Sequence, residues 1–380
     1  MTEKLYYKDA YIKDFCATVL SCEYREPYYY AVLDKTAFFP EEGGQSADTG
    51  RLSDAEVLDV KEKDGTVYHI IDKPLEVLAT VKGVLDFDKR YDKMKQHTAE
   101  HIISGIINRL YGYSNVGFHL GTGEVTCDFD GPLTREELDR VEDLANSAIA
   151  ANIPVVASFP GKDDLEKIEY RSKLDLKENV RIVSIDGVDT CACCAPHVNS
   201  TGELLLVKIL DFVKWRSGIR MTIAAGERAL IDYREKSASV KAISVLLSAP
   251  KSEVYAAVSD LKGAYEREKA LAKEHLFKIA KLEARGVKET DGNLVYFLEN
   301  MPIDALISFS NHARCKVRGM LVALSGEEGN YKYVISSDTV DLKSMIKDIN
   351  GALAGRGGGN SGMVQGSFAA TLESIKDYFN

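Results

Sequence analysis

The chain has 380 residues, of which 45% are hydrophobic and 28% are charged, with a formal net charge of −10. This composition is typical of a globular protein, and at roughly 100–200 residues per domain the length predicts two or three domains. No apolar run approaches the ~20 residues that a membrane-spanning helix needs, and no secretory signal is visible. Seven cysteines, three of them crowded into residues 191–194, argue against a secreted disulfide framework and predict a cytoplasmic protein with a thiol or metal site.

The negative charge is unevenly distributed along the chain. Residues 1–226 carry a net charge of −11, residues 227–286 carry +3, and residues 287–380 carry −2. A nucleic-acid partner therefore cannot be held by bulk charge. It would need local patches, shape complementarity or backbone amide groups.

The first 90 residues alternate short β-type runs with turns. Such runs lie at residues 28–33, 56–60 and 67–71, the last two separated by a turn-like Asp-Gly pair. This pattern predicts a β-rich subdomain over residues 1–90, twisted or barrel-like.

Residues 91–226 mix helical and strand patterns. Helices are expected at residues 91–110 and 134–152, and Thr134 with Glu137 has the form of a capping box at the start of the second. Strands are expected at residues 125–129, 180–185 and 204–213.

Residues 227–286 lack strand patterns, and Ala249-Pro250 divides them into two helices, which we interpret as a helical hairpin. The sequence pattern of the last part, residues 287–380, predicts an α/β unit with strands at 321–324 and 332–335. A helix at 342–353 runs into the glycine-rich GRGGGNSG. The predicted fold class is α+β, in four parts that end at residues 90, 226, 286 and 380.

The strongest local motif is HTAEH, in which His97 and His101 are spaced i,i+4. On a helix this spacing places both imidazoles on one face, one turn apart. The isoleucines that follow occupy the opposite side, so the imidazoles are expected to face a cleft or solvent.

A second motif, CACCAPH, contains Cys193 and His197 with C-x3-H spacing. Two histidines on a helix with a cysteine and a histidine on a loop form a ligand set suited to zinc. Cys191 and Cys194 remain alternatives, because spacing alone does not choose among the three cysteines.

Two glycine-rich segments are further candidates. In FFPEEGGQSADTG, Gly43 and Gly44 permit close backbone approach and Gln45 offers both a donor and an acceptor. The other segment, residues 355–362, follows a helix and could expose backbone N–H groups to phosphate. The alternatives are a hairpin turn and a flexible loop without a ligand.

Together these segments, in this order, resemble the freestanding alanyl-tRNA editing proteins and the editing and C-terminal domains of alanyl-tRNA synthetase. The matching stretches read FFPEEGGQSADTG, HTAEH, CCAPHVNSTGE and GRGGGNSG. The resemblance spans nearly the whole chain, and no ATP-binding core precedes it, which indicates the long AlaX type. One departure is that the family usually has Gly-Gly-Thr where this chain has Cys194-Ala195-Pro196.

The resemblance implies a zinc-dependent hydrolase that removes serine, or glycine, from mischarged alanine tRNA. It implies that zinc is held by His97, His101, Cys193 and His197. Thr36 and Gln45, beside Gly43 and Gly44, would contact the aminoacyl group. A C-terminal DHH-associated domain would dock on the tRNA, and a homodimer fits the family. The residues assigned to tRNA binding are Arg314, Lys316, Arg318, Arg356, Gly357, Gly358 and Gly359.

Two other classes of function stay open at this stage. HTAEH also fits the H-x-x-E-H pattern of inverted zinc proteases, with Glu100 as general base and Glu166, Glu169 or Glu178 as third ligand. A non-catalytic tRNA-binding module is the second alternative. The sequence does not decide between serine and glycine, nor whether zinc activates water or positions the tRNA end.

Overall fold

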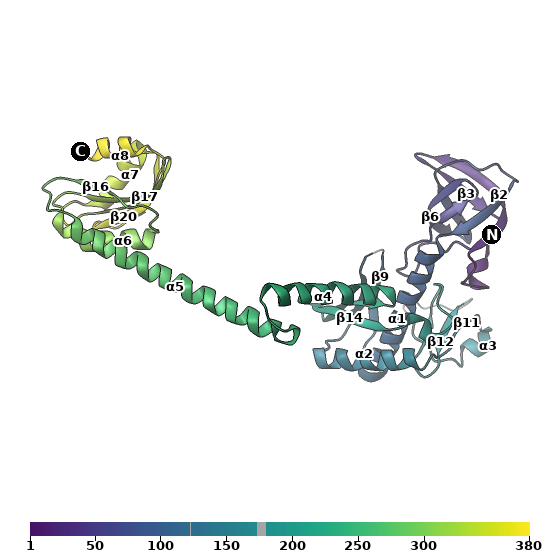
Figure 1. The fold of residues 1–380 in the computed structure, drawn as a ribbon. Coiled ribbons are helices and arrows are strands. Elements are labelled where there is room, and N and C mark those ends of the chain that lie inside the picture. The colour runs from purple at the N-terminus through teal and green to yellow at the C-terminus, as the bar shows by residue number, and fades with distance from the viewer. Residues whose placement is uncertain (122, 173–179) are drawn as a thin grey trace. The chain divides into compact units, whose positions relative to one another are not determined.

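The computed structural model describes residues 1–121, 123–172 and 180–380, and these form two compact units, Met1–Ser239 and Val240–Asn380 (Figure 1). Both helices and strands are abundant in each unit, so the predicted α+β class is confirmed. The four-part division remains a prediction. Within the described ranges, no helix is both long enough and apolar enough to cross a membrane.

The first unit begins with a closed β-barrel. Its side chains alternate between inside and outside, as in β8, where Val81 and Leu85 are buried and Lys82 and Val84 are exposed. Closure leaves no strand edge unpaired within the barrel. In barrel order, the strands are β2 (Asp14–Arg25), β3 (Tyr28–Leu33), β7 (Thr66–Ile71), β6 (Ala55–Lys63), β5 (Gly50–Leu52) and β8 (Thr80–Leu85).

Helix α1 (Phe87–Tyr111) follows the barrel and carries the HTAEH motif. It ends at Gly112, which adopts the left-handed conformation (φ 71°) and donates its N–H to the Asn108 carbonyl. The apolar face of α1, including Ile102 and Ile106, is buried in the largest core of the unit. This face fixes the rotation of the helix about its axis, and so fixes where the opposite face points.

That core lies between α1, α2 (Arg135–Ala150) and a four-stranded antiparallel sheet. The predicted capping box is confirmed, because the Thr134 side chain accepts from the Glu137 N–H and the Glu137 carboxylate accepts from the Thr134 N–H. The strands, in sheet order, are β14 (Val207–Trp215), β15 (Gly218–Ala225), β10 (Val125–Phe129) and β9 (Asn115–Leu120).

A smaller three-stranded sheet leads into the CACCAPH loop. It consists of β11 (Val155–Ser158), β12 (Ile182–Ile185) and β13 (Asp189–Ala192), all antiparallel, with the one-turn helix α3 (Lys162–Leu165) between β11 and β12. In β13, Cys191 pairs with Val183 of β12, so Cys193 follows directly after the strand ends. Two short strands, β1 (Glu3–Lys4) and β4 (Lys35–Thr36), pair in parallel near the N-terminus.

The two helices predicted for residues 227–286 are present as α4 (Glu227–Leu246) and α5 (Val254–Gly286), with the break at Pro250. The boundary between the two compact units falls inside α4. The hairpin arrangement itself stays a prediction.

The second unit is a mixed five-stranded sheet with an apolar core on each face. Successive residues of β17 show this, because Leu321 packs with α5 and α6 while Val322 packs with α7 and α8. The strands, in sheet order, are β16 (Leu294–Phe297), β17 (Leu321–Glu327), β18 (Asn330–Ser336), β20 (Met363–Phe368) and β19 (Gly355–Gly359). The helices after α5 are α6 (Ile303–Ala313), α7 (Leu342–Ala352) and α8 (Leu372–Phe379).

The glycine run at residues 355–359 differs from the expected loop, because it forms the edge strand β19 paired with β20. A Cβ on Gly357 would lie 2.5 Å from the Tyr333 hydroxyl, and one on Gly366 would lie 2.7 Å from the same oxygen. Glycine is therefore required where Tyr333 packs across the two strands. The sequence pattern missed this strand because glycine is generally depleted in strands.

Candidate metal centre and cleft

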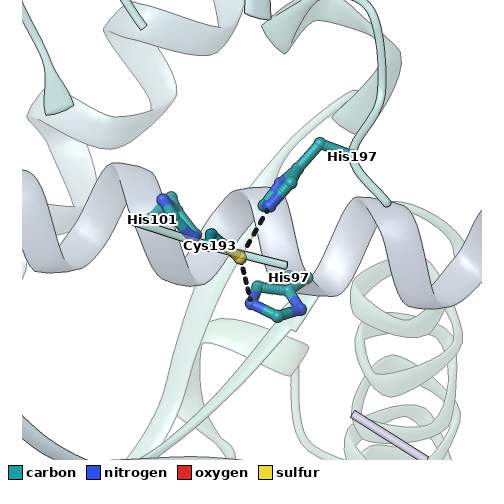
Figure 2. A group of neighbouring side chains, drawn as sticks. All are labelled: His97, His101, Cys193 and His197. Carbon is teal, nitrogen blue, oxygen red and sulfur yellow. Dashed lines mark hydrogen bonds between the residues drawn. The ribbon is translucent and has the colours of Figure 1, made fainter. Parts of the chain in front are cut away.

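Four of the predicted site residues converge in the first unit (Figure 2). His97 and His101 project from α1, while Cys193 and His197 lie on the loop after β13. One ligand atom from each lies within 4.8 Å of the others. The Cys193 Sγ is 3.3 Å from His197 Nε2 and 3.6 Å from His97 Nε2. The structure therefore brings together the ligand set that the resemblance implies. Of the three cysteines, Cys193 is grouped with all three histidines, while Cys191 is grouped with His101 and Asp189.

Each imidazole in this cluster is held through its Nδ1 atom, by a different partner. His97 Nδ1 is 3.0 Å from Gln45 Oε1, His101 Nδ1 is 2.9 Å from Asp189 Oδ2, and His197 Nδ1 is 3.0 Å from Thr98 Oγ1. Such outer hydrogen bonds fix ring orientation and tautomer at metal sites.

Thr98 shows how the tautomer is set. Its hydroxyl donates to the Met94 carbonyl at 2.8 Å, so its oxygen accepts from His197 Nδ1–H. The proton is thereby kept on Nδ1, and the Nε2 lone pair of His197 is left to face the Cys193 sulfur. That is the form of histidine that binds metals.

Electrostatics favour the metal-binding forms of Cys193 and His197. Burial raises the pKa of the Cys193 thiol, but the imidazoles of His97, His197 and His101 outweigh burial and bring it well below its usual value. Burial lowers the pKa of His197 to about 3, which keeps that ring neutral. A thiolate and a neutral imidazole are the states in which cysteine and histidine bind metal.

His101 differs from His197 because a carboxylate faces it. Burial lowers the pKa of His101, but the Cys193 thiolate and the Asp189 carboxylate raise it by more, to well above the usual value. Asp189 is itself anchored by Arg171, whose Nε and second terminal nitrogen donate at 2.7 and 2.8 Å. The result is a buried Arg171–Asp189–His101 chain that sequence reasoning did not identify.

The cluster borders a cleft of about 950 Å³. His97, His101 and Cys193 line it, while His197 is not among its lining residues. His97 and His101 thus face a cleft, as expected, although each is less than 5% exposed. Other parts of the wall come from Gly43 and Gly44, from β9 and from the cationic residues Arg171 and Arg181.

Gly44 lets the GGQ segment lie directly against β9. The Leu120 N–H donates to the Gly44 carbonyl at 2.8 Å, and a Cβ on Gly44 would lie 2.4 Å from the Phe118 carbonyl oxygen. A larger residue would push the segment away from β9 and with it Gln45, which follows at once. The glycines are therefore part of how the site is assembled, in agreement with their predicted place beside it.

Gln45 and Thr36 were predicted to contact the substrate, and their side chains have different hydrogen-bond partners. Gln45 is fully buried beside His97, and its Nε2 has no hydrogen-bond partner in the described chain. Thr36 is fully buried, with its Oγ1 2.8 Å from His69 Nε2, and like Gln45 it is not among the residues that line the cleft. The structure does not bring Thr36 to the cleft, because its hydroxyl is used inside the protein by His69 and by the Phe38 N–H.

A polar cluster next to the histidines was missed from the sequence as a unit. The Glu100 carboxylate, which lines the cleft, accepts from Ser104 Oγ and from Asn115 Nδ2, each at 2.6 Å. Ser104 is one helical turn after Glu100, so its position could be anticipated. Asn115 could not, because it comes from β9.

The residues predicted to bind tRNA all lie in the second unit. Lys316 Nζ donates to three backbone carbonyls at the end of α5, at 2.8–3.2 Å, so it caps that helix. Arg314 pairs with Asp338 at 3.3 Å, and Arg318 pairs with Asp291 on the exposed surface. Arg356 lies on the glycine strand and lines a shallow pocket with Lys332.

The third ligand nominated for a zinc protease is not found at this site. Glu166 and Glu169 are exposed and do not belong to the cluster of ligand atoms. Glu178 lies outside the described residues. In their place Cys193 and His197 complete the set, which argues against the protease interpretation.

Comparison with known proteins shows which proteins this chain resembles. Residues 180–229 match the family described as the threonyl and alanyl tRNA synthetase second additional domain. The alanyl-tRNA editing protein AlaX-L of Pyrococcus horikoshii is 28% identical, over 99% of this chain and 97% of its own length. The alanyl-tRNA editing protein Aarsd1 of Rattus norvegicus is 26% identical, over 94% of this chain and 92% of its own length.

Among solved structures, the C-Ala domain of alanyl-tRNA synthetase from Aquifex aeolicus matches 23% of this chain and 86% of its own, with 21% identity and a TM-score of 0.21. The relationship therefore rests on the sequence matches that cover nearly the full length of both proteins. The chain is a relative of the freestanding alanyl-tRNA editing proteins of the long AlaX type, which it resembles over nearly its whole length.

Proposed function

We propose that this protein is a cytoplasmic trans-editing hydrolase that removes serine, or glycine, from mischarged alanine tRNA. The substrate is an ester between the amino acid and the terminal ribose of the tRNA. The observation that carries the proposal is the cluster of His97, His101, Cys193 and His197 at the wall of a large cleft. The names of the full-length relatives supply the substrate class.

The cluster fits zinc by the chemistry of its donors. Three imidazoles are held by Nδ1 so that Nε2 can face a common centre, and the fourth donor is a thiol whose pKa is lowered by those imidazoles. Nitrogen and sulfur donors of this kind would suit zinc. When bound, zinc polarises an ester carbonyl or lowers the pKa of a bound water.

The protein's own residues prepare the site. Gln45, Asp189 and Thr98 orient the imidazoles, and burial of the cluster strengthens every charge interaction within it. The Gly43–Gly44 turn brings one wall of the cleft onto β9. The site is thus shaped before any substrate arrives, which reduces the reorganisation needed during the reaction.

Selectivity is the purpose of such an enzyme. A synthetase pocket built for alanine cannot strongly reject a near-isostere that adds one hydroxyl, so a second site that binds the hydroxyl is useful. Gln45 is our candidate for that contact because its buried Nε2 has an unused donor capacity. Thr36 is a weaker candidate, since its hydroxyl is already bonded to His69.

For tRNA recognition, we propose that the second unit docks on the tRNA through β19 and its cations. As the edge strand, β19 pairs on one side only, with β20, and Arg356 points from it into a pocket shared with Lys332. Arg318 is the most exposed of the remaining candidates. A homodimer, which fits the family, is a separate proposal tested by the mass of the protein in solution.

The decisive experiment is deacylation of alanine tRNA charged with serine, glycine or alanine. We expect hydrolysis of the seryl or glycyl ester in preference to the alanyl ester, loss of activity on chelation and recovery with zinc. Full activity in the chelated, zinc-free protein would contradict the metal role. Binding of tRNA without deacylation of any ester would favour a non-catalytic module, and cleavage of casein would favour the protease.

A further inference from the structure

Glu100 is a buried acidic residue on the wall of the cleft whose charge the proposed mechanism does not use. Its side chain is 5% exposed and lies on α1 directly before His101. Ser104 and Asn115 both donate to its Oε1 atom, each at 2.6 Å. Two donors on the same oxygen hold the carboxylate in one orientation and leave Oε2 as its free edge.

The free edge has no cationic partner at hydrogen-bonding distance. Oε2 lies 3.9 Å from His101 Nε2 and has no hydrogen bond within the ranges that the structure describes. The described basic residues that line the cleft form their hydrogen bonds and ion pairs with other groups. Arg171 pairs with Asp189, Lys4 pairs with Glu62, and Arg181 donates to the carbonyls of Cys193 and Ala195.

Buried carboxylates are usually paired with a cation, because an isolated buried charge is costly. Among the described residues, the cationic group within ion-pairing distance of Glu100 is that of His101, which is itself a proposed metal ligand. A cleft that holds a fixed carboxylate, whose neighbouring imidazole is taken up by the proposed metal, therefore suits a substrate that brings its own positive charge. That charge has to lie close to the metal centre, because His101 is the neighbour of Glu100 on both the helix and the wall.

We propose that Glu100 binds the α-ammonium group of the aminoacyl ester, an inference that rests on the proposed function. In such an ester the amino nitrogen is two bonds from the carbonyl carbon. A substrate held by its ammonium at Oε2 thus presents its carbonyl beside the ligand cluster. Esters whose amine is blocked, as in a peptidyl-tRNA, lose this contact and are disfavoured.

The test compares two esters of alanine tRNA in the zinc-loaded full chain. One is seryl-tRNA, and the other is its α-hydroxy analogue, made by nitrous acid deamination, in which a neutral hydroxyl replaces the ammonium. The quantity is the ratio of their kcat/KM values after subtraction of spontaneous hydrolysis. Because the intrinsic reactivity of the two esters is common to all variants, only the change in this ratio between variants is interpreted.

We expect Glu100→Gln to lower this ratio about 10- to 100-fold, the usual effect of losing a charge-assisted hydrogen bond, mainly by slowing hydrolysis of the seryl ester. Glu100→Asp, which keeps the charge, should retain part of the preference. Glu42→Gln is the matched control, because Glu42 is an exposed carboxylate on the same cleft. It should leave the ratio at the wild-type value.

Zinc content and thermal unfolding are measured on every variant. An unchanged ratio in Glu100→Gln overturns the inference while leaving the proposed function intact. Loss of zinc or of the fold in Glu100→Gln also overturns it, because Glu100 then supports the metal site. If the wild-type protein hydrolyses neither ester, the proposed function and this inference fall together.

Discussion

The metal-centre region and the glycine-strand region differ in how their polar residues are arranged. In the first unit, His97, His101, Cys193 and His197 meet within 4.8 Å, and a further set of side chains orients them. In the second unit, three of the cations proposed for tRNA binding have partners of their own: Lys316 caps α5, and Arg314 and Arg318 pair with Asp338 and Asp291. Chemistry at a bond needs convergent groups, whereas docking of a polyanion can use dispersed ones.

If this contrast is correct, substitution of Cys193 will cause the largest loss of zinc and of activity. Cys193→Ala should lose zinc and reduce deacylation to the spontaneous rate, because it removes the thiolate that the three imidazoles surround. Elemental analysis and seryl-tRNA hydrolysis measure this. Cys194→Ala is the matched control, since that neighbouring thiol is outside the ligand cluster. Equal losses in both variants would mean that the loop as a whole, and not the Cys193 ligand, is what matters.

A smaller loss is expected when an orienting residue is changed. Asp189→Asn keeps the size of the side chain but weakens its bonds to His101 and Arg171, and outer partners of metal ligands typically contribute about 10- to 100-fold in metal affinity. Zinc affinity is measured by competition with a chelator. Wild-type affinity would show that Asp189 serves Arg171 alone.

The proposed docking of the second unit on tRNA is tested by removing that unit from the chain. A fragment ending at Ser239, where the first compact unit ends, should retain zinc but bind alanine tRNA roughly ten-fold or more weakly than the full chain, because residues 1–226 carry a net −11. Filter binding of both proteins over a salt series provides the measurement. Affinities that match at every salt concentration would remove tRNA docking from the second unit and leave dimerisation as its role.

The smallest effect is expected at Gln45. Gln45→Ala should lower the ratio of seryl to alanyl hydrolysis by roughly ten-fold, the effect of one hydrogen bond, and should also weaken zinc because Gln45 holds His97. Thr36→Val is the control, since the Thr36 hydroxyl bonds only inside the protein, with His69 and the Phe38 N–H. A drop in selectivity for Thr36→Val that equals the drop for Gln45→Ala would return Thr36 to the substrate site.

Much of the fold could be predicted because short-range interactions determine it. The strand at residues 125–129 and the helices around 91–110 and 134–152 follow from periodicity and capping, and the structure shows each of them within a few residues. The i,i+4 spacing of His97 and His101 places both on one helix face by helical geometry alone. The glycine strand β19 was missed, because its pairing depends on Tyr333 and β20, which no local pattern reveals.

The sequence by itself therefore determined the ligand types, their spacing and the relationship to the editing proteins. Only the tertiary structure grouped Cys193 with all three histidines, while Cys191 lies near His101 and Asp189. It also determined that the Thr36 hydroxyl bonds to His69 and that Asn115 of β9 donates to the Glu100 carboxylate. The physical reason is range: helix periodicity acts over a few residues, whereas these contacts join residues far apart in the chain, and only packing of the whole unit brings them together.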